Sequence, residues 1–345
     1  MIHLGTWEEA IKAKARELGY DGCGIIAAAP FQEFLAGVER RARLFPHAAP
    51  FYDKLEARVA SQPQAVVPWA RSIVVCLRRY DKYKLQPQLD QLVGKYYLFD
   101  GRLPYSPEYA AQADFEQFLT DSGFRIARER LPLRWAAVKA GLGKFRNNNF
   151  VYTAQGSWHW IDAWLVDKPL AYDQPGGDSR FPCPPNCNKC IQACPTGALT
   201  APLTMDATRC IAHLTFSEWD ALPPEDVRKT MGTYLYGCDE CQNTCPMNKA
   251  WQGKEEFVEP VALDSLLELE TLLAMDEVTY RNVLQPRFWY IAQKDFWQWR
   301  CNIIRAMANK DSKAYAPYFT KALEDTDARV RQMAEWALNS NRPTG

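Results

Sequence analysis

Eight of the eleven cysteines lie between residues 183 and 245, and their spacing constrains this chain more than any other feature. They follow the pattern C-x3-C-x2-C-x3-C-P, then one isolated cysteine, then C-x2-C-x3-C-P. Such short loops wrap three thiolates around one face of an iron–sulfur cubane, and the cysteine before proline ligates the neighbouring cluster in two-cluster ferredoxins. The spacing therefore predicts two [4Fe-4S] clusters. One is held by Cys183, Cys187, Cys190 and Cys245, and the other by Cys194, Cys210, Cys238 and Cys241.

Zinc and disulfides are the alternatives to iron for clustered thiols. Zinc sites commonly pair one C-x2-C with another around a single tetrahedral ion, which is a different arrangement. Disulfides are rare in a reducing cytosol. The first spacing is one residue longer than the usual x2 because of the extra proline in CPPNC, so Cys183 departs most from the ferredoxin pattern. The other three cysteines, Cys23, Cys76 and Cys301, lie in apolar or helical contexts and are predicted to be buried core thiols.

Composition and the N-terminal sequence indicate the cellular setting. The stretch MIHLGTWEEAIKAKAREL is amphipathic and charged, unlike a signal peptide. No apolar run approaches the ~18 residues that a membrane helix needs. Apolar residues make up 47% of the chain and charged residues 24%, as in ordinary soluble proteins. We therefore expect a cytoplasmic protein with no membrane partner. Its formal net charge of zero gives no sign of nucleic acid, although a local basic face is compatible with that charge.

The first part of the chain alternates between helical and strand patterns, which is typical of an α/β layer domain. Apolar runs predict strands at 21–28 and 71–80 and either a strand pair or one long strand at 156–167, and the pattern of 112–123 predicts a helix. A linker rich in Pro, Gly and Asp follows at 168–186.

The last part of the chain, from about residue 262, has a helical pattern, and residues 300–341 are expected to form two antiparallel helices. The segment DTDARVRQMAEWAL resembles one helical repeat of the HEAT type, capped by Asp325 or Asp327. Its inward positions are Val330, Met333, Ala334 and Leu338. We expect three domains: an α/β domain at 1–175, a double-cluster domain at 176–260 and a helical region at 261–345.

Two stretches carry a resemblance to a known family. They are LPLRWAAVKAGLGKFRNNNFVYTAQGSWHWIDAWLVDKPL at 131–170 and the cysteine module with CIQACPTGAL, RCIAHLTFSEW and YGCDECQNTCPMNK. In this motif order the chain resembles the epoxyqueuosine reductases, which are distantly similar to reductive dehalogenases. The resemblance covers nearly the whole chain. It implies an α+β fold with an α/β cobalamin-binding domain of nitroreductase-like type, a ferredoxin-like double-cluster domain and C-terminal HEAT-like helices.

The resemblance also implies an activity. The chain would be an oxidoreductase of tRNA queuosine maturation, with electrons passing from two [4Fe-4S] clusters to cobalamin. An external donor, such as a ferredoxin, a flavodoxin or a chemical reductant, would supply the electrons; tRNA is the implied partner and a monomer is expected. None of the four histidines lies in the D-x-H-x-x-G motif of corrinoid proteins, so the cobalamin is expected to be base-off, without a protein histidine below the cobalt.

The AGLGKFRNNN and GSW motifs supply the predicted cobalamin contacts. Small residues let the backbone approach a large flat ligand, and asparagine amides match the amide side chains of a corrin. The alternative is a helix end at Gly141 or Gly143, followed by an Asn-rich turn. The predicted contacts are Gly141, Gly143, Arg146, Asn147, Asn148, Gly156, Ser157 and Trp158.

The chain departs from the family pattern at the proton donor. The resemblance implies an aspartate shortly before AGLG, but this chain has ARERLPLRWAAVKAGLG there. Glu129 is the nearest carboxylate, and Tyr97 and Tyr105, with the neighbouring Tyr96, are phenol alternatives. The substrate therefore stays open between epoxyqueuosine in tRNA and a small molecule. A third possibility is an electron-transfer protein that reduces a corrinoid partner.

Overall fold

Two long, almost fully buried strands form the centre of a four-stranded antiparallel sheet with the order β1-β2-β6-β3. The structure is a computed structural model that describes residues 5–340, apart from 55, 82–90, 99–101, 105, 176–182, 217–221 and 250–265. The strands are β1 (Gly22–Ala27), β2 (Ser72–Arg79), β3 (Ile126–Ala127) and β6 (His159–Val166). The three strands predicted from apolar runs are confirmed, and 156–167 forms one strand rather than a pair.

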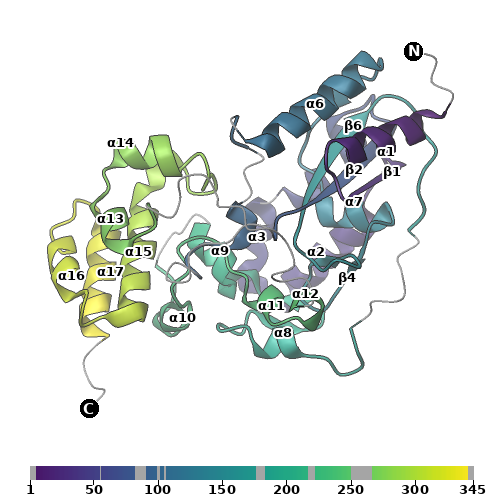
Figure 1. The fold of residues 1–345 in the computed structure, drawn as a ribbon. Helices are drawn as coiled ribbons and strands as arrows, with labels where there is room; N and C mark the ends of the chain where they lie inside the picture. Colours follow the sequence, from purple (N-terminus) through teal and green to yellow (C-terminus); the bar gives the residue numbers. More distant parts are fainter. Residues whose placement is uncertain are drawn as a thin grey trace.

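Helices cover both faces of this sheet (Figure 1). On one face, α1 (Trp7–Glu17) and α6 (Pro107–Asp121) pack Ile11 and Phe115 against Trp164. On the other, α7 (Leu133–Lys139) packs Ala136 and Ala137 against Leu165. The same side carries α2 (Gln32–Leu44) and the short helices α3 (Ala49–Lys54), α4 (Ala57–Ala60) and α5 (Pro63–Val66). Burial on both faces explains why the central strands read as continuous apolar runs.

A short hairpin after α7 carries the asparagine-rich turn. Gly141, at φ 70°, ends α7 in the left-handed region, and the chain then enters β4 (Lys144–Phe145) and β5 (Val151–Tyr152). Gly143 lies so close to this hairpin that a Cβ would be 2.7 Å from the carbonyl oxygen of Tyr152. Asn149 has φ 64°, a conformation that asparagine tolerates better than most residues. The predicted alternative of a helix end followed by an Asn-rich turn describes this local structure.

The cysteine-rich segment consists of short helices and one small hairpin. Its elements are α8 (Lys189–Gln192), β7 (Leu199–Ala201), β8 (Thr204–Met205), α9 (Ile211–Phe216), α10 (Glu225–Thr230), α11 (Glu240–Asn243) and α12 (Pro246–Lys249). In Figure 1 this segment lies between the sheet and the C-terminal helices. The four-residue helices α8 and α11 pack against each other, and each contains the second cysteine of a C-x2-C segment.

The C-terminal region is helical, as predicted, with three principal helices where two were expected. Its elements are α13 (Leu269–Ala274), α14 (Glu277–Thr279) with a π-helical turn at Tyr280–Leu284, α15 (Phe296–Asp311), α16 (Ala316–Ala322) and α17 (Ala328–Asn339). Asp327 caps α17 through its side chain. A continuous apolar core joins this region to the sheet, because Tyr80 and Trp158 share it with Tyr236 and Trp299.

Several predictions fall on segments outside the described residues. These include part of the 168–186 linker and the domain boundaries expected near 176 and 260. Cys76 and Cys301 are buried as predicted, whereas Cys23 is half-buried. Among the helices that the structure describes, none could span a lipid bilayer.

Candidate functional site

The structure places the eight clustered cysteines in two neighbouring groups, one with Cys183, Cys187, Cys190 and Cys245, and the other with Cys194, Cys210, Cys238 and Cys241. Burial raises the pKa of Cys190 to about 11, and neighbouring thiols add to the rise; these belong to Cys183, Cys245 and Cys187. Burial likewise raises the pKa of Cys238, and Cys210 and Cys241 lie close enough to contribute. Thiolates repel one another in this way unless a metal centre takes up their charge.

The two groups adjoin each other, and neither is spaced like a zinc site. Burial raises the pKa of Cys241; the thiols of Cys194 and Cys190, one from each group, contribute further. All eleven cysteines are free. In the described residues, no three His, Cys, Asp or Glu side chains are spaced to hold a single metal ion. A cubane needs thiols further apart than one tetrahedral zinc ion does.

The turn that precedes β5 ties both cysteine groups to the sheet-bearing part of the chain. Asn147 Nδ2 donates to the carbonyl oxygen of Cys187 at 2.7 Å. Asn148 Nδ2 donates to the carbonyl oxygen of Cys241 at 2.9 Å. Arg146 Nε donates to Cys183 Sγ at 3.4 Å. Arg146, Asn147 and Asn148 are predicted cobalamin contacts, and in the structure each of them also contacts a cysteine loop.

The Gly-Ser-Trp motif forms a second junction with the cysteine-rich segment. Ser157 N donates to Asn248 Oδ1 at 2.8 Å, and Ser157 Oγ accepts from Gln242 Nε2 and Asn248 Nδ2, both at 2.9 Å. All three side chains are buried. Gly156 has φ 89°, and a Cβ there would lie 2.5 Å from Asn248 Oδ1. Trp158 is buried beside Tyr80. The hydrogen bonds of Ser157 therefore make this a tight junction. Trp158 Nε1 is buried beside it without a hydrogen-bond partner among the described residues.

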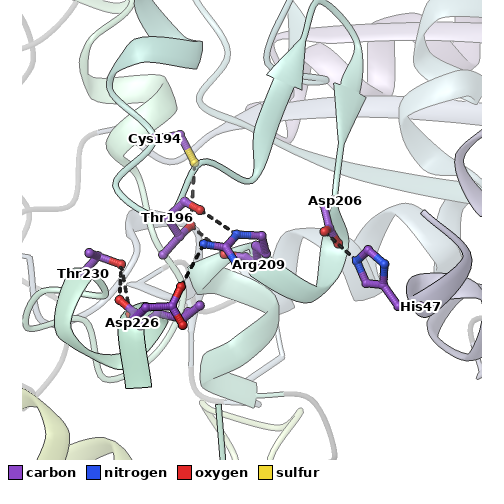
Figure 2. Close-up of polar contacts among 8 residues, drawn as sticks. His47, Cys194, Thr196, Asp206, Arg209, Asp226 and Thr230 are labelled. Atoms are coloured by element: carbon purple, nitrogen blue, oxygen red, sulfur yellow. Dashed lines mark hydrogen bonds and ion pairs between the residues drawn. The ribbon is translucent and has the colours of Figure 1, made fainter. Parts of the chain in front are cut away.

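Reciprocal hydrogen bonds between Thr196 and Arg209, drawn in Figure 2, fix the chain near Cys194. Thr196 Oγ1 donates to the carbonyl oxygen of Arg209 at 2.6 Å, and Arg209 Nε donates to the carbonyl oxygen of Thr196 at 2.9 Å. Arg209 also reaches Asp226 at 3.4 Å. Cys194 lies two positions before Thr196, and Cys210 directly follows Arg209. The Thr196–Arg209 pair therefore holds these two cysteines, sixteen positions apart in sequence, at one site.

A cavity of about 450 Å³ lies where the sheet, the asparagine turn and the cysteine-rich segment meet. All four cysteines of the second group line it, whereas those of the first group are absent from its described wall. The sheet contributes Leu77, His159 and Ile161, and the asparagine turn contributes Asn148, Asn149 and Phe150. Four tyrosines complete one side: Tyr80, Tyr96, Tyr97 and Tyr290. The volume is in the range of small-molecule and cofactor sites.

The predicted contact residues divide around this cavity. Asn148 and Ser157 line it. The described wall does not include Gly141, Gly143, Arg146, Asn147, Gly156 or Trp158.

The predicted proton donors divide in the same way. Tyr97 lines the cavity, and burial followed by the nearby Tyr236 raises its pKa. Glu129 is exposed and is not in the described wall, and Tyr105 lies outside the described residues. Leu133 and Arg134 occupy the wall in the segment where the resemblance led us to expect an aspartate.

Two carboxylates and two histidines in the wall were missed from the sequence. Asp239 Oδ2 accepts from Lys95 N at 2.7 Å, and Glu240 Oε1 accepts from Tyr234 OH at 3.0 Å. The histidines are His213 and His159. His159 is 8% exposed, its Nε2 lies 3.0 Å from Thr153 Oγ1, and its Nδ1 has no hydrogen-bond partner among the described residues. Burial lowers the pKa of His159 to about 4, so the ring is neutral at physiological pH. His159 lies in no cofactor-binding motif, so the sequence carries no local signal for its place in the wall.

Comparisons with known proteins agree with this arrangement. The family model described as "4Fe-4S double cluster binding domain" matches residues 183–248. The epoxyqueuosine reductase of Xanthomonas campestris is 30% identical, and the alignment covers 95% of this chain and 94% of that protein. The chain belongs to the epoxyqueuosine reductase family. The resemblance seen in the motif order is thus confirmed, and the chain is an oxidoreductase with a double [4Fe-4S] cluster domain.

Other members of the epoxyqueuosine reductase family extend the match. The enzyme of Leadbetterella byssophila is 32% identical over 80% of this chain and 90% of its own length. A solved epoxyqueuosine reductase in complex with a stem loop of epoxyqueuosine-modified tRNA-Tyr superimposes with a TM-score of 0.74 at 24% identity. That comparison covers 96% of this chain and 88% of the solved chain. At this identity it shows the shared fold, which confirms the expected α+β class.

Proposed function

We propose that this chain is a cobalamin-dependent epoxyqueuosine reductase that acts on tRNA in the cytoplasm, with electrons passing from the two [4Fe-4S] clusters to base-off cobalamin. One observation carries the proposal: the four predicted ligands of the second cluster all line a cavity bounded on its other side by the sheet. A redox cofactor in that cavity would lie directly beside the cluster. The family membership and the tRNA stem loop bound by a solved relative support the same substrate.

The residues around the cavity fit a large ligand rich in amide groups. Buried polar atoms in folded proteins almost always have a partner. In this wall, Asn149 Nδ2 and His159 Nδ1 are buried and have none among the described residues. The first is a donor, and the ring nitrogen donates or accepts according to its tautomer. Cobalamin carries a ring of amide side chains that can satisfy both. When bound, it supplies a cobalt centre that accepts single electrons and reduces the substrate.

The positions of the two cysteine groups suggest the order of electron delivery. The loop of the first group is exposed at Pro184, Asn186 and Lys189, so an external donor such as a ferredoxin or flavodoxin can approach it. The second group lies at the cavity. Two such clusters store and pass single electrons. The loops of both groups are held by the same asparagine turn, which fixes the separation between them.

Tyr97 is the proposed proton donor of the cavity. Its raised pKa keeps the phenol protonated at neutral pH, so the hydroxyl can donate toward a substrate oxygen. Tyr96 stacks on Trp160 at 4.6 Å between ring centroids and is a neighbouring phenol of the same wall. Glu129 is exposed and away from the described wall, which makes it the weaker candidate.

A second candidate function is the reduction of a small molecule by the same cofactors. One observation favours it: the cavity wall carries Leu133 and Arg134 where the family resemblance implies a catalytic aspartate. A guanidinium cannot act as that acid, because it stays protonated in proteins.

Anaerobic reconstitution with iron, sulfide and cobalamin tests both candidates. We expect eight iron atoms per monomer by the cubane assignment, a shift of the cobalamin absorption bands, and conversion of epoxyqueuosine in a tRNA stem loop. Full loading with cobalamin but no turnover of the stem loop would favour a small-molecule substrate. Cluster loading without any change in the cobalamin bands would instead indicate that the chain is an electron-transfer protein that reduces a corrinoid partner.

A further inference from the structure

Two arginines contact Asn149 at the edge of the cavity, and a third lies beside one of them. Arg41, in the last turn of α2, donates from its NH2 group to Asn149 Oδ1 at 2.9 Å. Arg134, on α7, donates from its NH1 group to the carbonyl oxygen of Asn149 at 3.2 Å. Arg40 lies close enough for its charge to act on Arg41. Within the part of the chain that the structure describes, none of the three makes an ion pair. Uncompensated positive charges placed together repel one another, and an anion would relieve this repulsion.

Buried donors without partners gather at the same place. Arg41 Nε, Asn149 Nδ2 and Tyr52 OH are all buried, and none has a hydrogen-bond partner among the described residues. A guanidinium only donates, so the contact with Arg41 assigns Oδ1 of Asn149 and leaves Nδ2 as the unused donor. The charge of Arg41 acts on Tyr52, which places these two side chains together. The ligand that completes this set must therefore supply acceptor oxygens.

One carboxylate adjoins the set and is already engaged. The charge of Asp206 contributes to the raised pKa of Tyr52, so the two side chains are near each other. However, Asp206 Oδ2 lies 2.7 Å from His47 Nε2, and Asp206 Oδ1 accepts hydrogen bonds from Thr208. It therefore does not neutralise the arginines. Burial lowers the pKa of Arg41, and the charges of Arg40 and Arg134 contribute to the lowering.

We propose that Arg41, Tyr52, Arg134 and Asn149, the Arg41 cluster, bind a phosphodiester group. Guanidinium groups bind phosphate oxygens through charge-assisted, often bidentate hydrogen bonds. Asn149 and Arg134 line the cavity, so a ligand that fills the cavity reaches the cluster. The proposal rests on the proposed function in one respect: cobalamin carries a single phosphodiester, in its nucleotide tail. An RNA backbone is the other source of the same chemistry.

Cobinamide, which has the corrin ring and its amides but no nucleotide tail, isolates this contact. Dissociation constants for cobalamin and cobinamide are measured by anaerobic optical titration of cluster-loaded protein. We expect wild-type protein to prefer cobalamin and Arg41→Met to lose about tenfold or more of its cobalamin affinity, with cobinamide unchanged. Arg41→Lys should keep most of the preference. Arg43→Met, which removes an exposed arginine from the same helical turn, should keep all of it.

Asn149→Gly is the second variant, because glycine accepts the φ of 64° while the amide is removed. It should reduce the preference for cobalamin, and iron content checks that the variants are folded. Equal losses for cobalamin and cobinamide in both variants would mean that the cluster merely braces the turn, and would overturn the proposal. An unchanged preference in both variants would overturn it as well, unless RNA is the source.

Binding of an RNA hairpin, followed by fluorescence anisotropy with saturating cobinamide present, separates the two sources. Loss of RNA affinity in Arg41→Met, with the cobalamin preference intact, supports a phosphodiester site and assigns it to the RNA backbone. If wild-type protein binds neither corrinoid, the proposed function fails. The RNA comparison, run without cobinamide, then decides the phosphodiester site alone, and equal RNA affinities of wild type and Arg41→Met overturn it.

Discussion

The buried ring of His159 makes the stability of the fold depend on pH in a defined window. Burial lowers the pKa of this histidine to about 4, whereas an unfolded chain has the ordinary value near 6.5. Between these values the unfolded chain binds a proton that the folded chain does not. Stability is therefore constant above about pH 6.5 and falls as the pH drops toward 4. The pKa difference between the folded and unfolded states corresponds to about 3 kcal/mol of unfolding free energy. Roughly 1 to 2 kcal/mol of this is already lost at pH 5.5.

The variant His159→Gln removes the titration and keeps a side chain that can reach Thr153 Oγ1. Urea unfolding under anaerobic conditions, followed by tryptophan fluorescence, gives the free energy of unfolding at pH 7.5 and 5.5. At pH 7.5 the ring is neutral in both states, so the difference between the proteins at that pH reports packing alone. Between pH 7.5 and pH 5.5, the free energy of unfolding of the wild-type protein should fall by roughly 1 to 2 kcal/mol more than that of the variant. Equal losses in the two proteins would refute the assignment of a neutral, buried ring.

Three further substitutions test the junctions around the clusters. Asn248→Leu leaves the amide N–H of Ser157 buried without an acceptor, and we expect a loss of about 3 kcal/mol with reduced iron retention, measured by thermal unfolding and iron analysis. Arg146→Gln removes a charge and a hydrogen bond at Cys183 Sγ, so the reduction potential of the first cluster should fall; a redox titration followed by electron paramagnetic resonance checks this. Gly143→Ala places a Cβ 2.7 Å from a backbone oxygen and should cost about 1–3 kcal/mol, whereas wild-type thermal stability would contradict the packing described here.

The cysteine groups and the central strands were predictable from the sequence because their signals are local. Cluster ligands must recur at short intervals, since one loop has to reach several corners of a cubane. The apolar run at 71–80 predicts a buried strand without reference to its neighbours, and β2 is buried along nearly its whole length. The helix at Ala328–Asn339 is equally local: Asp327 caps it, and the predicted inward residues Val330, Met333 and Ala334 are buried, whereas Leu338 is half-buried.

The cavity wall was less predictable because it is assembled from distant segments. His159 begins a strand, and its burial depends on neighbours that are remote in sequence. Asp239 and Glu240 lie between Cys238 and Cys241, and in the sequence that segment indicates a cluster-binding loop and not a cavity wall. Glu129 was chosen because it is near the glycine motif in sequence, yet its position in the fold is exposed. Proximity along the chain is a poor guide where a loop can point either way.

The three consecutive asparagines have the same side chain but different partners in the fold. Their amides were expected to serve one ligand together, but each has a different partner. Asn147 holds the loop of Cys187, Asn148 holds the loop of Cys241, and Asn149 is held by two arginines at the cavity. The left-handed conformation at Asn149 reverses the chain after the first two residues, so the third amide faces elsewhere.

The asparagine turn couples the two cysteine groups to the cavity. One short turn contacts a loop of each cysteine group and also contributes to the wall of the cavity, so the three cannot move independently of it. Electron transfer requires fixed separations, and ligand recognition requires a fixed wall. Anchoring all of them to a hairpin that is packed against the sheet meets both needs with a single rigid element. A disturbance of this hairpin should therefore alter cluster properties and ligand binding together, whereas a change confined to Asn149 should alter ligand binding alone.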